Sequence, residues 1–207
     1  MIAEYVAVIA GGYLLGSIPS GLVLGKLKGV DVRQYGSGKT GTTNVLRTIG
    51  KKYAAIALAA DVLKGVVAVL IGGYIIGSPA GEMAAGFAAI AGHDWSVFIK
   101  FQGGRGVATT MGAVLPMEPL AAVASIGIFV FVIALTRYVS LGSMMGTLSA
   151  VVLVAAFAAV DRVPVEYAIY AGVASGLIVI QHKANLTRLL SGRENKLGQK
   201  AAKLDTG

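Results

Sequence analysis

The sequence contains no cysteine and few charged residues. Among its 207 residues the absence of cysteine excludes a disulfide framework and a thiolate metal site, and two histidines make a poor metal site of another kind. Only 14% of the residues are charged and 56% are hydrophobic, which excludes a water-soluble domain of this length. The composition therefore predicts a protein whose solvent is a lipid bilayer.

Apolar runs predict an all-α integral membrane protein, a compact bundle of about seven transmembrane helices in a single domain over residues 1–207. A spanning helix needs about 20 apolar residues, so the short fourth run predicts a half-length helix, and five crossings remain the alternative. No basic secretory n-region precedes the first run, so we expect that run to stay in the membrane. The runs are Ile2–Leu24, Ala54–Ile76, Met83–Ile99, Val107–Leu115, Leu120–Leu135, Leu141–Val160 and Val165–Ile180.

Basic residues predict the orientation of this bundle. All but Lys64 and Arg162 of the 18 Lys and Arg residues fall in alternate connections, whereas the remaining connections are mainly acidic. Because cytoplasmic loops are enriched in Lys and Arg, the segments at about 25–53, 100–106, 136–140 and 181–207 are predicted to be cytoplasmic, with the amino terminus outside. The net charge of +8 then indicates attraction to anionic lipid headgroups, and we expect no nucleic-acid partner.

The longest basic connection contains a polar, glycine-rich cluster at residues 36–47. Its glycines allow several backbone N–H groups to turn toward one anion, its hydroxyls are short donors, and Arg47 carries a guanidinium that matches phosphate. The end of this pattern imitates a nucleotide-binding P-loop, but Arg33 occupies the position of the first glycine and no strand precedes it, so an ATPase is disfavoured. The phosphate-binding candidates are Ser37, Gly38, Lys39, Thr43, Asn44 and Arg47.

Two further polar clusters lie in the other basic connections. Gly103-Gly104-Arg105-Gly106 opens into an apolar helix that carries Thr109, and glycines at a helix N-terminus can expose unpaired N–H groups to phosphate. His182 and Asn185 lie where the last run ends. Taken alone, a Gly-Gly turn is also an ordinary connector, and a histidine at a helix end is also an ordinary interfacial residue. Convergence of all three clusters on one face of the bundle would favour a functional site over these structural explanations.

Several other polar residues are second candidates. Asp61 and Lys64 are spaced i, i+3 within a predicted span, which favours a structural ion pair, and His93 precedes the second glycine cluster. Ser140 and Ser143 flank a short connection and can either donate to a substrate or bond a helix carbonyl. Small residues four apart predict close helix contacts. They are Gly12 and Gly16, Gly21 and Gly25, Gly142 and Gly146, and Gly172 and Gly176.

Together these motifs resemble the acyl-phosphate-dependent glycerol-3-phosphate acyltransferase family, usually called PlsY, along essentially the whole chain. The matching segments are Gly16-Ser17-Ile18-Pro19-Ser20-Gly21, Thr43-Asn44-Val45-Leu46-Arg47, Asp61-Val62-Leu63-Lys64-Gly65, Gly92-His93, the segment 101–109, Ser140-Leu141-Gly142-Ser143 and His182. The sequence departs from the family pattern at Lys39 (usually asparagine), Thr42 (usually alanine), Arg105 (usually lysine) and Ala184 (usually glutamate). The last change leaves any ion pair made there without its acid.

The resemblance implies transfer of a fatty acyl group from acyl phosphate to the 1-hydroxyl of glycerol 3-phosphate, without a cofactor or metal, in the bacterial inner membrane. It implies catalytic roles for Ser37, Arg47, His182 and Asn185, and glycerol 3-phosphate binding at Gly103 to Gly106. A soluble phosphate acyltransferase that supplies acyl phosphate would be a transient partner. The H-x-x-x-x-D box of the other large acyltransferase class is absent, so acyl-CoA is not the expected donor. The alternative function is a small membrane transporter for an organic phosphate.

Overall fold

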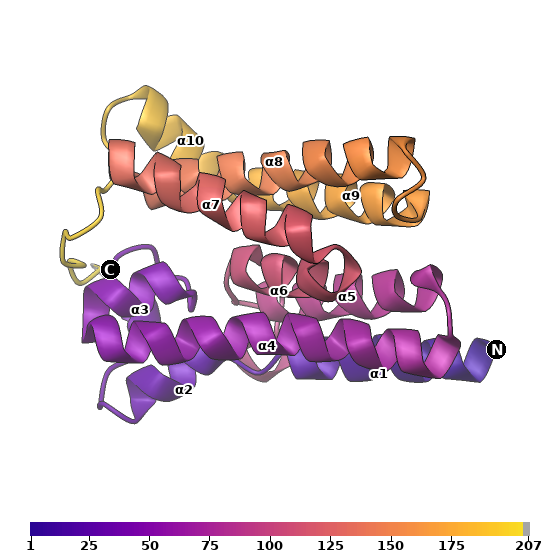
Figure 1. Cartoon of the computed structure of the whole chain (residues 1–207). Helices are drawn as coiled ribbons and strands as arrows, with labels where there is room; N and C mark the ends of the chain where they lie inside the picture. Colours follow the sequence, from indigo (N-terminus) through magenta and orange to yellow (C-terminus); the bar gives the residue numbers. More distant parts are fainter. Residues whose placement is uncertain (205–207) are drawn as a thin grey trace.

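The structure is a computed structural model that describes residues 1–204, and helices account for its regular elements apart from one isolated bridge (Figure 1). Four helical segments are long and apolar enough to cross a membrane, namely Ile2–Lys26, Lys51–Ile76, Pro119–Thr136 and Val139–Ala159. The elements are α1 (Ile2–Gly16), α2 (Ser20–Lys26), η1 (Val32–Gln34), α3 (Thr42–Ile49), α4 (Lys51–Ile76), α5 (Pro79–Asp94), η2 (Val97–Ile99), α6 (Val107–Met117), α7 (Pro119–Thr136), α8 (Val139–Ala159), α9 (Val165–Gln181) and α10 (Lys183–Leu190).

Each of the seven predicted apolar runs is helical, but two predicted boundaries are wrong. The first run is broken at Pro19, which precedes α2 as its N-cap and has no N–H to continue the helix. The third run ends at Asp94 instead of Ile99, because the backbone leaves the helical conformation at Trp95 (φ −129°, ψ 63°) and a separate 3-10 turn follows. The short helices α3 and α10 were predicted as loops, since neither contains an apolar run of spanning length. The last three residues of the predicted segment 181–207 lie outside the described residues.

The helices pack as two groups, with α7, α8 and α9 on one side and α1, α4 and α5 on the other (Figure 1). The short helix α6 packs against α4 and also contacts α7 and α9, so it joins the two groups. Tyr170 of α9 is fully buried and its ring centroid lies 4.6 Å from that of Phe87 in α5. The apolar core therefore runs through both groups of helices.

Several glycines allow helix backbones to touch. A Cβ on Gly16 would lie 2.1 Å from the carbonyl oxygen of Ala89, and one on Gly65 would lie 2.2 Å from that of Thr109. Such approaches are how small residues bring membrane helices together. The prediction of a close contact is wrong for Gly172 and Gly176, where an added Cβ would have nothing within 4 Å.

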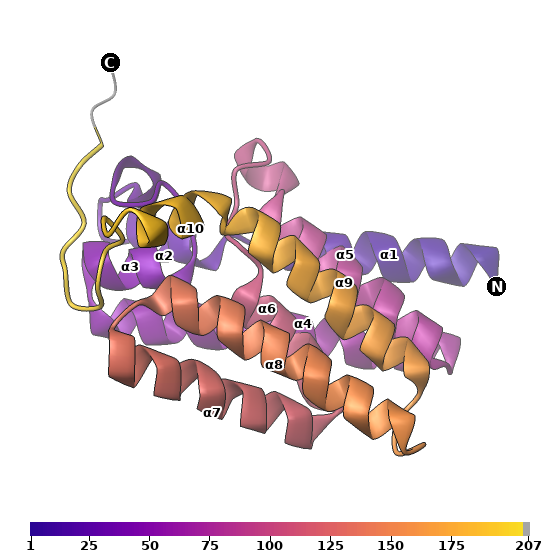
Figure 2. The same cartoon turned by 90° about the horizontal axis from the view of Figure 1, so that it is seen from above.

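The chain after α10 returns across one end of the bundle (Figures 1 and 2). The Leu197 N–H donates to the Arg137 carbonyl at the α7–α8 turn, and the Ala201 N–H donates to the Arg47 carbonyl of α3. In the connection between α2 and α3, which we call the first loop, the Gln34 carbonyl accepts from the Leu204 N–H. We call the end formed by α2, α3, α10 and residues 191–204 the basic end. Backbone hydrogen bonds thus join the tail to the α7–α8 turn, to α3 and to the connection between α2 and α3.

Candidate active site

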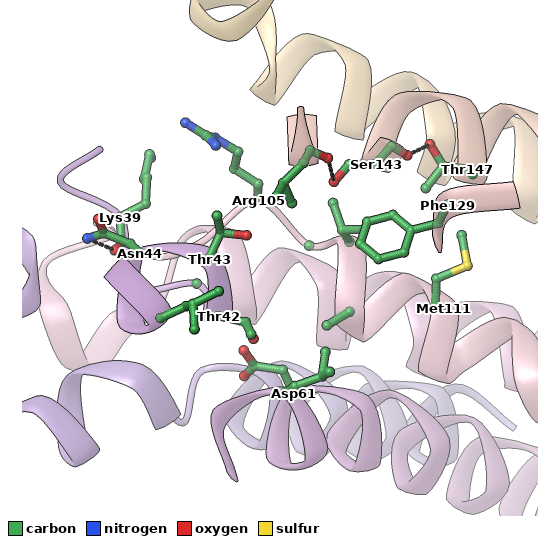
Figure 3. Close-up of a pocket in the computed structure, with 18 of the residues that line it drawn as sticks. Lys39, Thr42, Thr43, Asn44, Asp61, Arg105, Met111, Phe129, Ser143 and Thr147 are labelled. Atoms are coloured by element: carbon green, nitrogen blue, oxygen red, sulfur yellow. Dashed lines mark hydrogen bonds between the residues drawn. The ribbon is translucent and has the colours of Figure 1, made fainter. Parts of the chain in front are cut away.

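A cavity of about 420 Å³ extends from the basic end into the bundle, between α4 and α6 on one side and α7 and α8 on the other. Lys39 and Arg105 lie toward one end of it, and Phe129 and Met111 lie toward the other (Figure 3). A smaller pocket of about 30 Å³ adjoins the polar end and shares Thr43, Arg105 and His182 with the cavity. The site is therefore polar at one end and apolar at the other.

All three polar clusters of the sequence contribute to these pockets. From the predicted set, the residues that line one pocket or both are Ser37, Lys39, Thr43, Asn44, Arg47, Asp61, His93, Arg105, Gly106, Ser140, Ser143, His182 and Asn185. Gly38, Lys64, Gly103, Gly104 and Thr109 do not line either pocket. Thr109 is fully buried where α6 meets Gly65 of α4. Segments far apart in the sequence thus meet at one place.

The first loop is shaped by Asn44, a buried residue of α3. Its amide nitrogen donates to the carbonyls of Val32, Tyr35 and Lys39 at 2.8, 3.0 and 2.9 Å, and its oxygen accepts from the Ser37 N–H at 3.2 Å. These bonds fold the loop around one side chain and bring Ser37 and Lys39 to the cavity. The Asn44 amide therefore holds the loop in place, and because Asn44 also lines the cavity, its substrate contact stays a prediction.

Two arginines bring unsatisfied donors to the polar end. The Nε atoms of Arg47 and Arg105 are buried and have no hydrogen-bond partner among residues 1–204. One Nη of Arg47 donates to the Asn195 carbonyl at 3.0 Å, which holds the side chain against the tail. Because buried donors are normally satisfied, and guanidinium groups bind phosphate strongly, this pair fits an anionic ligand.

The second glycine cluster differs from its prediction. The N–H groups of Gly103 and Gly104 donate to the carbonyls of Asp94 and His93 at 3.1 and 2.9 Å, so the expectation that they are free for phosphate is wrong. A Cβ on Gly104 would lie 2.0 Å from Nε2 of His93, and one on Gly103 would lie 1.9 Å from the His93 carbonyl. These glycines permit close packing on the end of α5.

The residues of this segment that line the cavity come a few positions later in the chain. Gly106 has φ +71° and is the N-cap of α6, and with Val107 and Ala108 it lines the cavity. The first N–H groups of a helix have no acceptor within the helix and carry its positive dipole end. The N-terminus of α6 is therefore the part of this cluster suited to an anion.

His182 is buried at the end of α9 and has a defined tautomer. Its Nδ1 lies 2.8 Å from the Ile178 carbonyl, and because a carbonyl only accepts, Nδ1 carries the proton and Nε2 keeps its lone pair. Burial, aided by the positive charge of Arg105, lowers the pKa of His182 to about 4. The imidazole is thus neutral at pH 7 and offers a hydrogen-bond acceptor.

Glu194, which the sequence reasoning missed, organises the third cluster. Its carboxylate accepts from Asn185 Nδ2 at 2.6 Å, Ser140 Oγ at 2.8 Å and Arg188 Nε at 2.8 Å. Burial alone would raise the pKa of Glu194, but these hydrogen bonds lower it. The ion pair of this cluster, between Arg188 and Glu194, therefore takes its acid from the tail. A usable signal was present, because Glu194 is the single acid among the basic residues from 183 to 203.

Asp61 and Lys64 form the predicted ion pair, at 2.9 Å, and the structure adds His93 to it. Lys64 Nζ lies 2.6 Å from His93 Nδ1, so the ring accepts through Nδ1. Ser20 Oγ donates to Asp61 at 3.1 Å. This buried cluster ties α4 to α5 and α2, while Asp61 and His93 also line the cavity. Ser143 bonds the Val139 carbonyl at 2.9 Å, the second of its two predicted alternatives.

Known proteins match this chain over nearly its whole length. The sequence model of the glycerol-3-phosphate acyltransferase family matches residues 6–192. A glycerol-3-phosphate acyltransferase of Thermoanaerobacter pseudethanolicus is 47% identical over 201 residues, which cover 97% of this chain and 98% of the relative. Glycerol-3-phosphate acyltransferase 3 of Dehalococcoides mccartyi is 43% identical over 214 residues, with 97% and 99% covered.

Solved structures give the same result. The crystal structure of PlsY, an integral membrane glycerol 3-phosphate acyltransferase, in its glycerol 3-phosphate form matches with a TM-score of 0.87 and 40% identity over 94% of this chain and 96% of that chain. Its lysophosphatidic acid form matches with a TM-score of 0.84 and 39% identity over 94% and 95%. This chain belongs to the glycerol-3-phosphate acyltransferase family of integral membrane proteins.

Proposed function

We propose that this protein transfers a fatty acyl group from acyl phosphate to the 1-hydroxyl of glycerol 3-phosphate, which yields lysophosphatidic acid and inorganic phosphate. The observation that carries the proposal is a cavity with its adjoining pocket. At the polar end two arginines carry buried donors that have no partner within residues 1–204, and at the other end the side chains are apolar. Both substrates carry phosphate, and the donor also carries an acyl chain. The glycerol 3-phosphate and lysophosphatidic acid forms of PlsY have the same fold.

Each part of the site is assigned one group of the reactants. Arg105 and the N-terminus of α6 bind the phosphate of glycerol 3-phosphate, while Ser37, Arg47 and Asn185 bind the acyl phosphate head. The acyl chain lies in the apolar part, lined in part by Met111 and Phe129. Because acyl phosphate is already activated, positioning and charge stabilisation are the main requirements.

The proton balance limits the role of His182. The glycerol hydroxyl oxygen attacks the acyl carbon, the bond from that carbon to the phosphate oxygen breaks, and the hydroxyl proton must leave. An imidazole whose pKa is about 4 is a weak base at neutral pH, so His182 orients the hydroxyl through Nε2. A substrate phosphate oxygen, whose second pKa is about 6 for a phosphate ester, takes the proton.

In the membrane, the proposed arrangement is one domain with seven crossings. The basic end faces the cytoplasm of a bacterial inner membrane, and the amino terminus is outside, which agrees with the excess of Lys and Arg in α2, α3, α10 and the tail. The active site then opens toward soluble glycerol 3-phosphate, and a soluble phosphate acyltransferase delivers acyl phosphate by transient contact with the membrane surface.

The test is release of inorganic phosphate from palmitoyl phosphate by purified protein, with and without glycerol 3-phosphate. We expect release to require glycerol 3-phosphate, to accompany lysophosphatidic acid, and to fall about 100-fold in Arg105→Ala, since a charge-assisted contact is worth about 1.5–3 kcal/mol. Ser37→Ala should also largely abolish phosphate release. Arg193→Ala, which removes an exposed charge, is the matched control. Folded protein without turnover would contradict the proposal and direct the work to phosphate-ester uptake in proteoliposomes.

A further inference from the structure

The connection between α5 and α6 exposes three aromatic rings. Trp95, Phe98 and Phe101 are 42%, 60% and 59% exposed, whereas Ser96 and Ile99 between them are buried. In Figure 2 this connection projects from the side of the bundle, whereas α3 and α10 lie at one of its ends. None of the three aromatic residues lines the cavity or the smaller pocket.

Two hydrogen bonds join this connection to the end of α1 and so fix its position along the bundle. Tyr13 Oη donates to the Trp95 carbonyl at 2.7 Å, and Ser96 Oγ donates to the Ser17 carbonyl at 2.6 Å. Ser17 follows the 15-residue helix α1, which is about 22 Å long at 1.5 Å per residue. Since the hydrocarbon core of a bilayer is about 30 Å thick, a helix of this length that starts near the opposite boundary brings the connection to the headgroup boundary at the basic end.

The segment is built to present its rings outward. Lys100 and Phe101 have φ of +55° and +61°, a left-handed conformation that residues other than glycine rarely adopt and that must be enforced by surrounding contacts. The Phe101 N–H donates to the Ser96 carbonyl at 2.8 Å, and Ile99 is buried in a cluster with Leu22. The turn is thus held with Phe98 and Phe101 exposed.

The chemistry of this surface identifies its partner. Aromatic rings are enriched where a membrane meets water, and a lysine there reaches the headgroups while its stem stays in lipid. Trp95, two phenylalanines and the exposed Lys100 supply this combination. The neighbouring first span also exposes Ile18 and Val23, so the aromatic surface continues a lipid-facing one.

We infer that the segment Trp95–Phe101 is an anchor that inserts into the lipid at the headgroup boundary and fixes the depth of Arg105. The chain passes directly from Phe101 to the second glycine cluster, whose Gly103 and Gly104 amides are bonded to the end of α5. Arg105 is therefore joined to the anchor by a short, constrained segment. The anchor takes a lipid surface as its partner and does not depend on which acyl donor the enzyme uses.

Trp95 is the one tryptophan of the chain, so its fluorescence reports this segment alone. The experiment compares quenching in vesicles of phosphatidylcholine brominated at shallow or deep acyl positions with quenching by aqueous acrylamide. We expect shallow bromines to quench most and acrylamide to quench weakly. A tryptophan in the exposed tail, introduced as Arg193→Trp in a Trp95→Phe background, should be quenched strongly by acrylamide and weakly by the brominated lipids. Strong acrylamide quenching of Trp95 without bromolipid quenching would overturn the inference and leave the surface for a soluble partner.

A second measurement separates anchoring from folding. The double variant Phe98→Ser/Phe101→Ser should raise the KM for glycerol 3-phosphate about tenfold in bilayers and much less in detergent, because a small misplacement of a binding group is costly and only a bilayer sets its depth. Phe98→Leu/Phe101→Leu should restore the bilayer value. Equal effects in both media would contradict the anchor. Absence of turnover in the unmodified protein would refute the proposed function and leave the fluorescence result intact.

Discussion

The two ends of the cavity are built by different means. At the polar end, Asn44 donates to backbone carbonyls of the first loop, and His182 donates to the Ile178 carbonyl one turn earlier in α9. At the apolar end, Met111 and Phe129 are held by packing alone. A buried polar group that loses its partner costs about 1–3 kcal/mol, whereas an apolar exchange of similar volume costs less than about 1.5 kcal/mol. The polar end should therefore be the more sensitive to single substitutions.

The largest expected effect comes from adding one methyl group beside His93. Gly104→Ala should destabilise the protein by about 3 kcal/mol, because the new Cβ would overlap the buried imidazole at 2.0 Å. Gly172→Ala, which has open space around it, should be neutral or stabilising by up to about 1 kcal/mol. Thermal unfolding in detergent, followed by Trp95 fluorescence, measures both. Equal unfolding temperatures in the two variants would contradict the close packing of the glycine cluster.

Glu194 tests whether the tail is part of the polar end. Glu194→Ala should cost about 2 kcal/mol, because Asn185, Ser140 and Arg188 lose their acceptor together. Glu194→Gln keeps one acceptor oxygen and should lie between this variant and the unmodified protein. Glu4→Ala, at the exposed amino terminus, is the control. The heat stability and phosphate release of the set are compared, and a Glu194→Ala protein as stable and active as the control would refute the role.

His182 tests the polar end through the pH dependence of stability and of the reaction rate. Since its folded pKa is lowered to about 4 from an ordinary value of about 6.5, the unfolded state binds more protons between these pH values, and stability should fall as pH drops from about 6.5 toward 4. His182→Gln should remove that slope. If the ring only orients the hydroxyl, the variant should lose about tenfold in rate, because one neutral hydrogen bond is worth about 1 kcal/mol. A loss of about 100-fold or more, which is typical of removing a general base, would show that His182 is the base.

The apolar end should give the smallest effect. Met111→Phe should shift the preference toward shorter acyl chains by about fivefold in kcat/KM, because the added volume shortens the space at the end of the cavity farthest from Lys39 (Figure 3). Met111→Leu, which conserves volume, should leave the preference unchanged. Competition between lauroyl and palmitoyl phosphate gives the ratio, and an unchanged ratio in Met111→Phe would remove this region from chain recognition.

Local patterns in the sequence were sufficient for much of the fold. Apolar runs predicted the helices that become α4, α6, α7, α8 and α9 within a few residues, because burial in lipid depends on the composition of each run by itself. They failed for α3 and α10, whose helices are short and polar and form against neighbouring segments. The ion pair of Asp61 and Lys64 was also predictable, because both residues lie on one helix face.

What the sequence determined by itself was the bilayer environment, the helical fold and three polar clusters, each the result of residues close together along the chain. Only the tertiary structure decided which groups within those clusters remain available. It commits the Gly103 amide to Asp94, places Glu194 of the tail beside Asn185, and leaves the Nε donors of two arginines without a partner in the described part of the chain. The physical reason is that a hydrogen bond depends on the distance between atoms in space, and these partners meet only when the helices have packed.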